Sequence, residues 1–237
     1  MLQILFRSDL PLSDKIILLS TFLFTIMIAI SFHEMSHAWQ AYRLGDDTAQ
    51  RAGRLTMNPL AHLDPIGTVM LMLAGIGWAK PTPINPVLFT RAKTMKRGII
   101  EVSLAGPLSN LLLAFISYFL YRTTETIGLG FTESNPVFYV LLTLFGLMTS
   151  LNITLAIFNL LPLPPLDGYK IFGSLLPNEL YYKIMAYERY IGIIFLMLIL
   201  FGGNILFNFL AFVRIPFEFI IQTPINLLFN WIISLIT

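Results

Sequence analysis

The sequence contains no cysteine and few charged residues. Only 12% of its 237 residues are Asp, Glu, Lys or Arg, whereas soluble domains contain about 25%. The lack of cysteine excludes disulfides and thiolate metal ligands. The net charge is only +2, so no nucleic-acid partner is indicated. Hydrophobic residues make up 56% of the chain, which indicates a protein that is partly surrounded by lipid.

Apolar runs that approach or exceed the length of a membrane span recur along the chain. A bilayer core about 30 Å thick needs about 20 apolar residues in a helix. The runs cover residues 16–32, 102–121, 134–166, 190–213 and 219–237. The third must include a loop, and Arg214, Pro216 and Glu218 separate the last two. The first run is longer than the apolar part of a typical signal peptide, so we expect a retained span.

A shorter apolar segment, residues 65–79, contains Gly67, Gly75 and Gly77. Segments of this length are often re-entrant or interfacial. The fold class predicted is therefore an all-α polytopic membrane protein with about five transmembrane helices plus this short segment. We expect one membrane-embedded domain over residues 1–237, with C-terminal helices at 190–237.

Lysine and arginine are distributed unevenly between the connections. Residues 122–136 hold one, whereas residues 41–97 hold eight: Arg43, Arg51, Arg54, Lys80, Arg91, Lys93, Lys96 and Arg97. By the positive-inside rule, the second stretch is cytoplasmic. If residues 65–79 do not span, the run 134–166 ends at the same face as the first run. The localisation predicted is the cell membrane, with several passes.

Two of the three histidines form a motif at the end of the first run, His33-Glu34-Met35-Ser36-His37. Side chains four residues apart share one helical face, so two imidazoles can bind one Zn²⁺ and Glu34 can reach a bound water. Zinc lowers the pKa of that water to about 7, and Glu34 would pass its proton to a leaving amine. A chance match is the alternative, but polar groups at membrane depth are costly.

Catalytic zinc usually has three protein ligands, and Asp167 is the main candidate for the third. It follows the prolines of residues 162–165 at the end of an apolar run, where a carboxylate favours a cation. The alternative is that Asp167 caps the next helix. His62 and Asp64 are the competing ligands, although a lone histidine in a proline-flanked loop is more often structural.

Several segments together resemble the site-2 protease family of intramembrane metalloproteases. They are His33-Glu34-Met35-Ser36-His37, Asn159-x-x-Pro162-x-Pro164-x-x-Asp167-Gly168, Ala105-Gly106-Pro107-Leu108-Ser109-Asn110 and parts of residues 54–67 and 77–81. The chain is similar to compact bacterial members that lack a PDZ or CBS domain, because no hydrophilic stretch is long enough for an insertion. The resemblance covers about residues 20–175.

The resemblance implies that His33, His37 and Asp167 bind one zinc ion and that Glu34 is the catalytic acid/base. The active site would then lie toward the cytoplasmic side.

The resemblance also suggests that Asn159 positions substrate or stabilises the developing oxyanion. A helix–helix hydrogen bond is the alternative role for Asn159, because intramembrane asparagines commonly make one. Gly106 and Asn110 are expected to allow close helix packing.

The function implied is that of a zinc metalloendopeptidase acting in regulated intramembrane proteolysis. It would cleave a membrane-protein substrate within or next to a transmembrane segment. Relatives typically act on a membrane-anchored regulator that another protease has already trimmed. A substrate helix must unwind before cleavage, and the proline-rich residues 80–86 would offer an extended edge to it. The alternative is that these residues are a structural loop that covers the site.

The rival function is a non-catalytic membrane zinc-binding or scaffold protein. Glu34 favours the enzyme, because a zinc binder does not need that carboxylate. A metal transporter would favour several ligands along a path, whereas this chain has one compact set. The partners expected are a transmembrane protein substrate and the lipid bilayer, and the sequence leaves the oligomeric state open.

Overall fold

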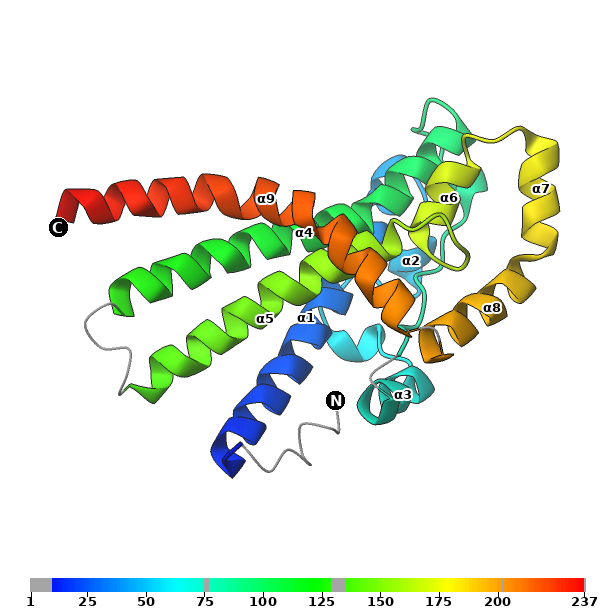
Figure 1. The fold of residues 1–237 in the computed structure, drawn as a ribbon. Helices are drawn as coiled ribbons and strands as arrows, with labels where there is room; N and C mark the ends of the chain where they lie inside the picture. The colour runs from blue at the N-terminus through cyan, green and yellow to red at the C-terminus, as the bar shows by residue number, and fades with distance from the viewer. Residues whose placement is uncertain (1–9, 75–76, 129–134, 202, 237) are drawn as a thin grey trace.

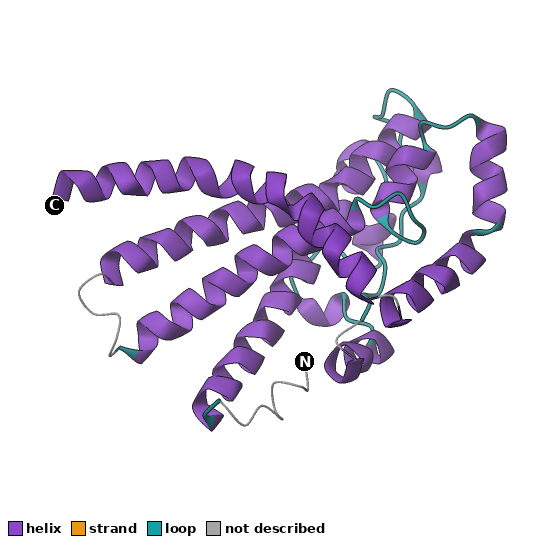
Figure 2. Ribbon diagram, in the orientation of Figure 1, coloured by secondary structure: helices purple, strands orange, loops and turns teal. Residues whose placement is uncertain are grey.

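The computed structural model describes residues 10–74, 77–128, 135–201 and 203–236, which form helices and loops without any strand (Figures 1 and 2). The helices are α1 (Leu12–Leu44), α2 (Thr48–Arg51), η2 (Pro59–Ala61), α3 (Pro65–Ala74), η3 (Pro86–Leu88), α4 (Met95–Gly128), α5 (Pro136–Asn159), α6 (Asp167–Gly173), α7 (Asn178–Ala186), α8 (Glu188–Phe201) and α9 (Gly203–Ile236). The prediction of an all-α polytopic membrane protein is confirmed.

Four of the described helices are long and apolar enough to cross a membrane. They are α1, α4, α5 and the part of α9 from Asn208 to Leu235. The described part of the predicted 65–79 segment includes α3, which has ten residues and is about 15 Å long. A helix of this length covers about half the thickness of a bilayer core, so α3 is too short to span the membrane. Residues 75–76 of that segment lie outside the described part of the chain.

The prediction that Arg214, Pro216 and Glu218 separate two C-terminal spans was wrong. Residues 190–213 fall in two helices, α8 and α9, and α9 continues through Pro216 and Pro224 to Ile236. Arg214 and Glu218 lie one turn apart inside α9, and Nε donates to Oε1 at 2.6 Å. The two charges that resembled a polar connection therefore neutralise each other on one helix.

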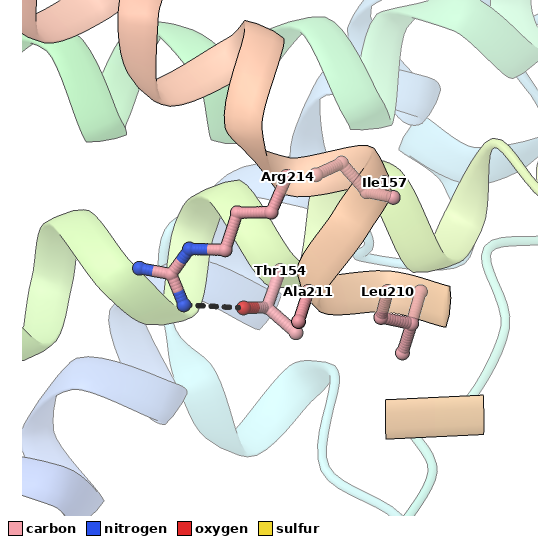
Figure 3. Close-up of a pocket in the computed structure, with 5 residues that line it drawn as sticks. All are labelled: Thr154, Ile157, Leu210, Ala211 and Arg214. Atoms are coloured by element: carbon pink, nitrogen blue, oxygen red, sulfur yellow. Dashed lines mark hydrogen bonds between the residues drawn. The ribbon is translucent and has the colours of Figure 1, made fainter. Parts of the chain in front are cut away.

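Helix α4 lies at the centre of the arrangement, in contact with α1, α5, α6 and α9 (Figure 1). A hydrophobic cluster joins α4, α5 and α9, and its buried members include Ala114, Ile153 and Leu210. A cavity of about 140 Å³ lies between α5 and α9, where Nη1 of Arg214 approaches Oγ1 of Thr154 at 3.5 Å (Figure 3).

Local sequence sets the helix ends that frame the site. Gly45 ends α1 in the left-handed conformation, with φ 109°, and a Cβ there would lie 2.5 Å from Oγ1 of Thr90. Helix α5 begins at Pro136, where Oδ1 of Asn135 accepts a hydrogen bond from the Val137 backbone N–H. It ends at Asn159, before the prolines of residues 162–165, which resist continuation of a helix.

Two buried charged side chains fix the proline-rich residues 80–86. Asp46 is fully buried, and its Oδ2 accepts a hydrogen bond from the Asn85 backbone at 2.6 Å. Arg54 donates to the Lys80 carbonyl at 3.3 Å, and the Lys80 N–H donates to the His62 carbonyl at 2.8 Å. The segment is therefore anchored at both ends, with Thr82 between them.

Candidate metal centre

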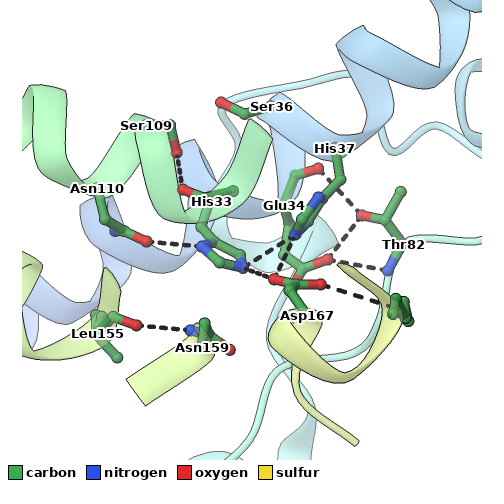
Figure 4. A network of polar contacts seen from close by, with 12 residues as sticks. His33, Glu34, Ser36, His37, Thr82, Ser109, Asn110, Leu155, Asn159 and Asp167 are labelled. Atoms are coloured by element: carbon green, nitrogen blue, oxygen red, sulfur yellow. Dashed lines mark hydrogen bonds and ion pairs between the residues drawn. The ribbon is translucent and has the colours of Figure 1, made fainter. Parts of the chain in front are cut away.

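Three buried side chains from two distant parts of the sequence converge at one point (Figure 4). His33 and His37 lie one turn apart on α1, and Asp167 is the first residue of α6. Oδ2 of Asp167 lies 3.1 Å from Nε2 of each histidine, and the two Nε2 atoms are 3.1 Å apart. The group could hold one metal ion.

Gly106 of α4 provides the space for both imidazoles. A Cβ at this position would lie 2.4 Å from Nε2 of His37 and 2.6 Å from Nε2 of His33. Helix α4 can therefore pack against the metal-facing side of α1 only because residue 106 has no side chain. The expectation that Gly106 allows close helix packing is confirmed.

The far nitrogen of each imidazole has a fixed partner. Nδ1 of His37 is 2.7 Å from the Val102 carbonyl, which can only accept a hydrogen bond. His37 therefore carries its proton on Nδ1 and leaves the Nε2 lone pair free. Nδ1 of His33 is 2.6 Å from Oδ1 of Asn110, also an acceptor. Partners of this kind orient metal-binding histidines in proteins.

The donor set fits a zinc ion. Two imidazole lone pairs and one carboxylate oxygen face each other at 3.1 Å, an arrangement that is repulsive unless a cation lies between them. Zinc binds histidine nitrogen and carboxylate oxygen, and catalytic sites supply three such ligands. His33, His37 and Asp167 therefore have the chemistry and the number of atoms that a catalytic zinc requires.

Asp167 is held as a charged carboxylate. Burial by itself raises the pKa of Asp167, but positive charge at the His37 and His33 imidazoles outweighs burial and lowers it well below its usual range. A proton or a metal ion shared by the three side chains supplies that charge. Lys170 lies 3.8 Å from Oδ1. The carboxylate thus faces the imidazoles instead of capping a helix end, and Leu166 occupies the cap position of α6.

Glu34 is held from the opposite direction, by the proline-rich segment. Oε2 of Glu34 accepts a hydrogen bond from the Thr82 backbone at 3.0 Å and one from the Thr82 hydroxyl at 2.8 Å (Figure 4). The same hydroxyl lies 3.2 Å from the Glu34 carbonyl. Because Glu34 and His37 are three residues apart on α1, they share a helical face.

The other candidate residues have local partners. Nδ2 of Asn159 donates to the Leu155 carbonyl of its own helix at 3.0 Å, and among the described residues it does not form the helix–helix bond considered for it. The ring of His62 is fully buried and contacts the Thr56 carbonyl at 2.8 Å. Asp64 accepts from the Gly67 backbone at 2.8 Å. These contacts give His62 and Asp64 structural roles within the connection.

Two contacts at the site were missed by sequence reasoning. Asn110 was expected to serve helix packing, and it does join α4 to α1, but it also holds the His33 ring. Thr82 was considered only as part of an extended segment. Asn110 and His33 are far apart in the sequence, so no local pattern predicts their contact. Thr82 lies between Pro81 and Pro83, and these prolines do indicate a backbone of restricted shape.

Comparison with known proteins identifies the family. The model described as peptidase family M50 matches residues 21–200. The chain is 43% identical over 178 residues to the "Putative zinc metalloprotease YwhC" of Bacillus subtilis, covering 73% of this chain and 77% of that protein. No solved structure matches the chain.

Two mycobacterial proteins, each named "Putative zinc metalloprotease Rip2", are more distant. The Mycolicibacterium smegmatis protein is 34% identical over 64% of this chain, and the match covers 54% of its own length. The Mycobacterium tuberculosis protein is 30% identical over 73% of this chain and 63% of its own. The match to peptidase family M50, together with four described helices that are long and apolar enough to cross a membrane and a buried His–His–Asp group, shows that this chain belongs to the site-2 protease family of membrane zinc metalloproteases.

Proposed function

We propose that this protein hydrolyses a peptide bond within or next to a transmembrane segment of another membrane protein, in regulated intramembrane proteolysis. The observation that carries the proposal is the position of the metal group. His33 and His37 lie in a helix long enough to span the membrane, and both are buried against α4. A substrate that reaches them must itself enter the membrane region.

His33, His37 and Asp167 are the proposed ligands of one zinc ion. Zinc bound there supplies Lewis-acid chemistry, which polarises a carbonyl oxygen. Nδ1–H donation from the histidines to Asn110 and Val102 keeps both Nε2 lone pairs directed at the ion.

Glu34 is the proposed acid/base. It takes a proton from the water that attacks the scissile carbonyl carbon and donates that proton to the amide nitrogen as the C–N bond breaks. Both Thr82 donors contact Oε2, so we assign proton transfer to Oε1. The two hydrogen bonds hold the carboxylate in one orientation while the other oxygen serves the reaction.

A substrate helix must unwind before it can be cut, because its carbonyls are bonded within the helix. The extended residues 80–86 would offer an edge to the unwound strand. Pro81, Pro83 and Pro86 have no N–H, and the Thr82 N–H is bonded to Glu34. The edge would therefore present mainly carbonyl oxygens, and substrate N–H groups would donate to them.

The resemblance to the family suggests a role for Asn159 in substrate positioning or oxyanion stabilisation. Its Nδ2 donates to the Leu155 carbonyl, so this role requires the amide to exchange that partner for the substrate oxygen. Asn159→Ala should therefore lower turnover without releasing zinc, and unchanged turnover would remove Asn159 from the mechanism.

The active site is proposed to face the cytoplasm. Eight of the lysines and arginines lie in residues 41–97, and both α1 and α4 join this stretch. Because the chain has no cysteine, single cysteines at positions 50, 93 and 133 can be labelled without background. Positions 50 and 93 should react from the cytoplasmic side and position 133 from the other. Labelling of 50 and 93 from opposite sides would contradict the topology.

The function itself is tested by comparing the membrane proteomes of cells that express the native chain or Glu34→Gln. Fragments of membrane proteins cut in or beside a span should appear only with the native chain. Identical fragments in both cell lines would contradict the proposed proteolysis.

A further inference from the structure

A chain of buried amides connects the centre of α5 to the His33 imidazole. Asn110 on α4 and Asn152 on α5 are both completely buried. Nδ2 of Asn110 donates to Oδ1 of Asn152 at 2.8 Å, and Oδ1 of Asn110 faces Nδ1 of His33 at 2.6 Å. The proposed mechanism uses His33 but leaves the role of Asn152 unexplained.

Two backbone carbonyls determine which group donates and which accepts in each hydrogen bond between Asn152, Asn110 and His33. The Met148 carbonyl accepts from Nδ2 of Asn152 at 2.8 Å, so Oδ1 of Asn152 must be the atom that faces Asn110. The Ala29 carbonyl is 3.3 Å from Nδ2 of Asn110. Rotating either amide by 180° would put oxygen against a carbonyl oxygen, because a carbonyl can only accept.

The orientation of the two amides also determines which ring nitrogen of His33 carries the proton. With both amides oriented, Oδ1 of Asn110 is an acceptor and requires a proton on Nδ1 of His33. A neutral imidazole has only one N–H, so Nε2 is left with a lone pair directed at Asp167 and His37. The opposite tautomer would place a proton where the metal ion must bind.

We propose that Asn152 is a positioning residue for the metal centre: acting through Asn110, it holds His33 in the tautomer and orientation that make Nε2 a zinc ligand. The proposal rests on the ligand set proposed above. It extends the centre from three side chains to a network that includes α4, α5 and the backbone of α1. Outer contacts of this kind typically change metal affinity by about 10–100-fold.

The test measures zinc affinity of the purified full-length chain by competition with a chelator at constant pH. Asn152→Ser suits this test, because a serine hydroxyl can donate to the carbonyl four residues earlier, as Thr149 and Thr154 do on the same helix. The matched control is Asn226→Ser. Asn226 accepts a hydrogen bond from Tyr118 at 2.7 Å and joins α9 to α4 away from the metal group.

Asn110→Ser should weaken zinc binding by about 10–100-fold, and Asn152→Ser should weaken it less, because the Ala29 carbonyl still orients Asn110. The double variant should bind zinc no more weakly than Asn110→Ser alone, since residues that act through one contact are not additive. Asn226→Ser should bind zinc with native affinity. If a serine variant does not fold, the corresponding leucine variant replaces it in the same comparison.

Two results would overturn the proposal: native affinity in Asn152→Ser, or a double variant whose loss is the product of the two single losses. His33→Ala in the same assay distinguishes a failure of this proposal from a failure of the proposed zinc ligand set. Native zinc affinity in His33→Ala would contradict the ligand set. Loss of zinc there, with native affinity in Asn152→Ser, would contradict the amide relay alone.

Discussion

His33 and Glu34 are neighbours on α1, but different regions of the molecule hold their side chains. The His33 ring is fixed from within the helix bundle, by Asn110 of α4 and behind it Asn152 of α5. The Glu34 carboxylate is fixed from outside the bundle, by Thr82 of the extended connection between α3 and α4. One turn of helix thus has two independent supports.

The proposed zinc ligands and the proposed acid/base are therefore held by different parts of the molecule. The supports of the histidines lie in long packed helices and end at backbone carbonyls, so they form whenever the bundle folds. The support of Glu34 depends on residues 80–86, which Asp46 and Arg54 anchor at their ends. Changes in the bundle should therefore affect zinc binding, whereas changes in the connection should affect turnover with zinc retained.

The largest expected effect is on zinc content after removal of a ligand. The native chain should hold about one zinc ion, as a site with three protein ligands does. His33→Ala, His37→Ala and Asp167→Ala should each leave the purified chain nearly free of zinc, as measured by elemental analysis. His62→Ala is the control, because His62 contacts Thr56 and not the metal group. Zinc lost from His62→Ala but kept in Asp167→Ala would mean that the third ligand is wrong.

A smaller effect on zinc affinity is expected when a Cβ is added beside the two histidines and no ligand is removed. Gly106→Ala would place a Cβ 2.4 Å from Nε2 of His37, so the imidazoles must move from their metal-binding positions. We expect zinc affinity to fall by about 10–100-fold, the usual cost of disturbing ligand orientation. Gly192→Ala on α8 is the matched control, since a Cβ there meets nothing within 4 Å. Equal affinity in the two variants would show that the helix contact does not constrain the centre.

The smallest effect is expected on turnover, when the contact between Thr82 and Glu34 is weakened. Thr82→Val removes the hydroxyl donor to Glu34 but keeps the shape and the backbone N–H. Turnover of a transmembrane substrate should fall about tenfold, because a hydrogen bond to a charged group contributes about 1.5–3 kcal/mol and one of the two donors remains. Zinc content and KM should stay native, and Thr82→Ser should restore turnover. A rise in KM with unchanged kcat would instead make residue 82 part of the substrate edge.

The ligand group could be predicted from the sequence, because few side chains can form it. Only three histidines occur, two of them share a helical face, and Asp167 follows a break in an apolar run. The structure brings these three side chains together as expected. That they bind zinc in this protein stays a prediction until ligand variants are measured.

The supports of the site could not be predicted, because they depend on how helices rotate and slide against each other. Asn152 is seven residues before Asn159 and so shares its helical face, but the sequence does not say which depth of α4 meets that face. Thr82 lies in a segment without periodicity. The continuous α9 was missed because Pro216 between Arg214 and Glu218 resembles a connection, whereas the structure pairs the two charges within one helix.

Zinc content and cleavage, measured on the same preparation of Glu34→Gln, test the central claim most directly. Glutamine keeps the size of the side chain and can still accept from Thr82, but it cannot take up a proton as a base. Cleavage of a transmembrane substrate should fall by about 10²–10⁴-fold, the usual contribution of a general acid–base group, while zinc content stays native. Cleavage near the native rate, or loss of zinc together with activity, would contradict the separation of metal binding from proton transfer.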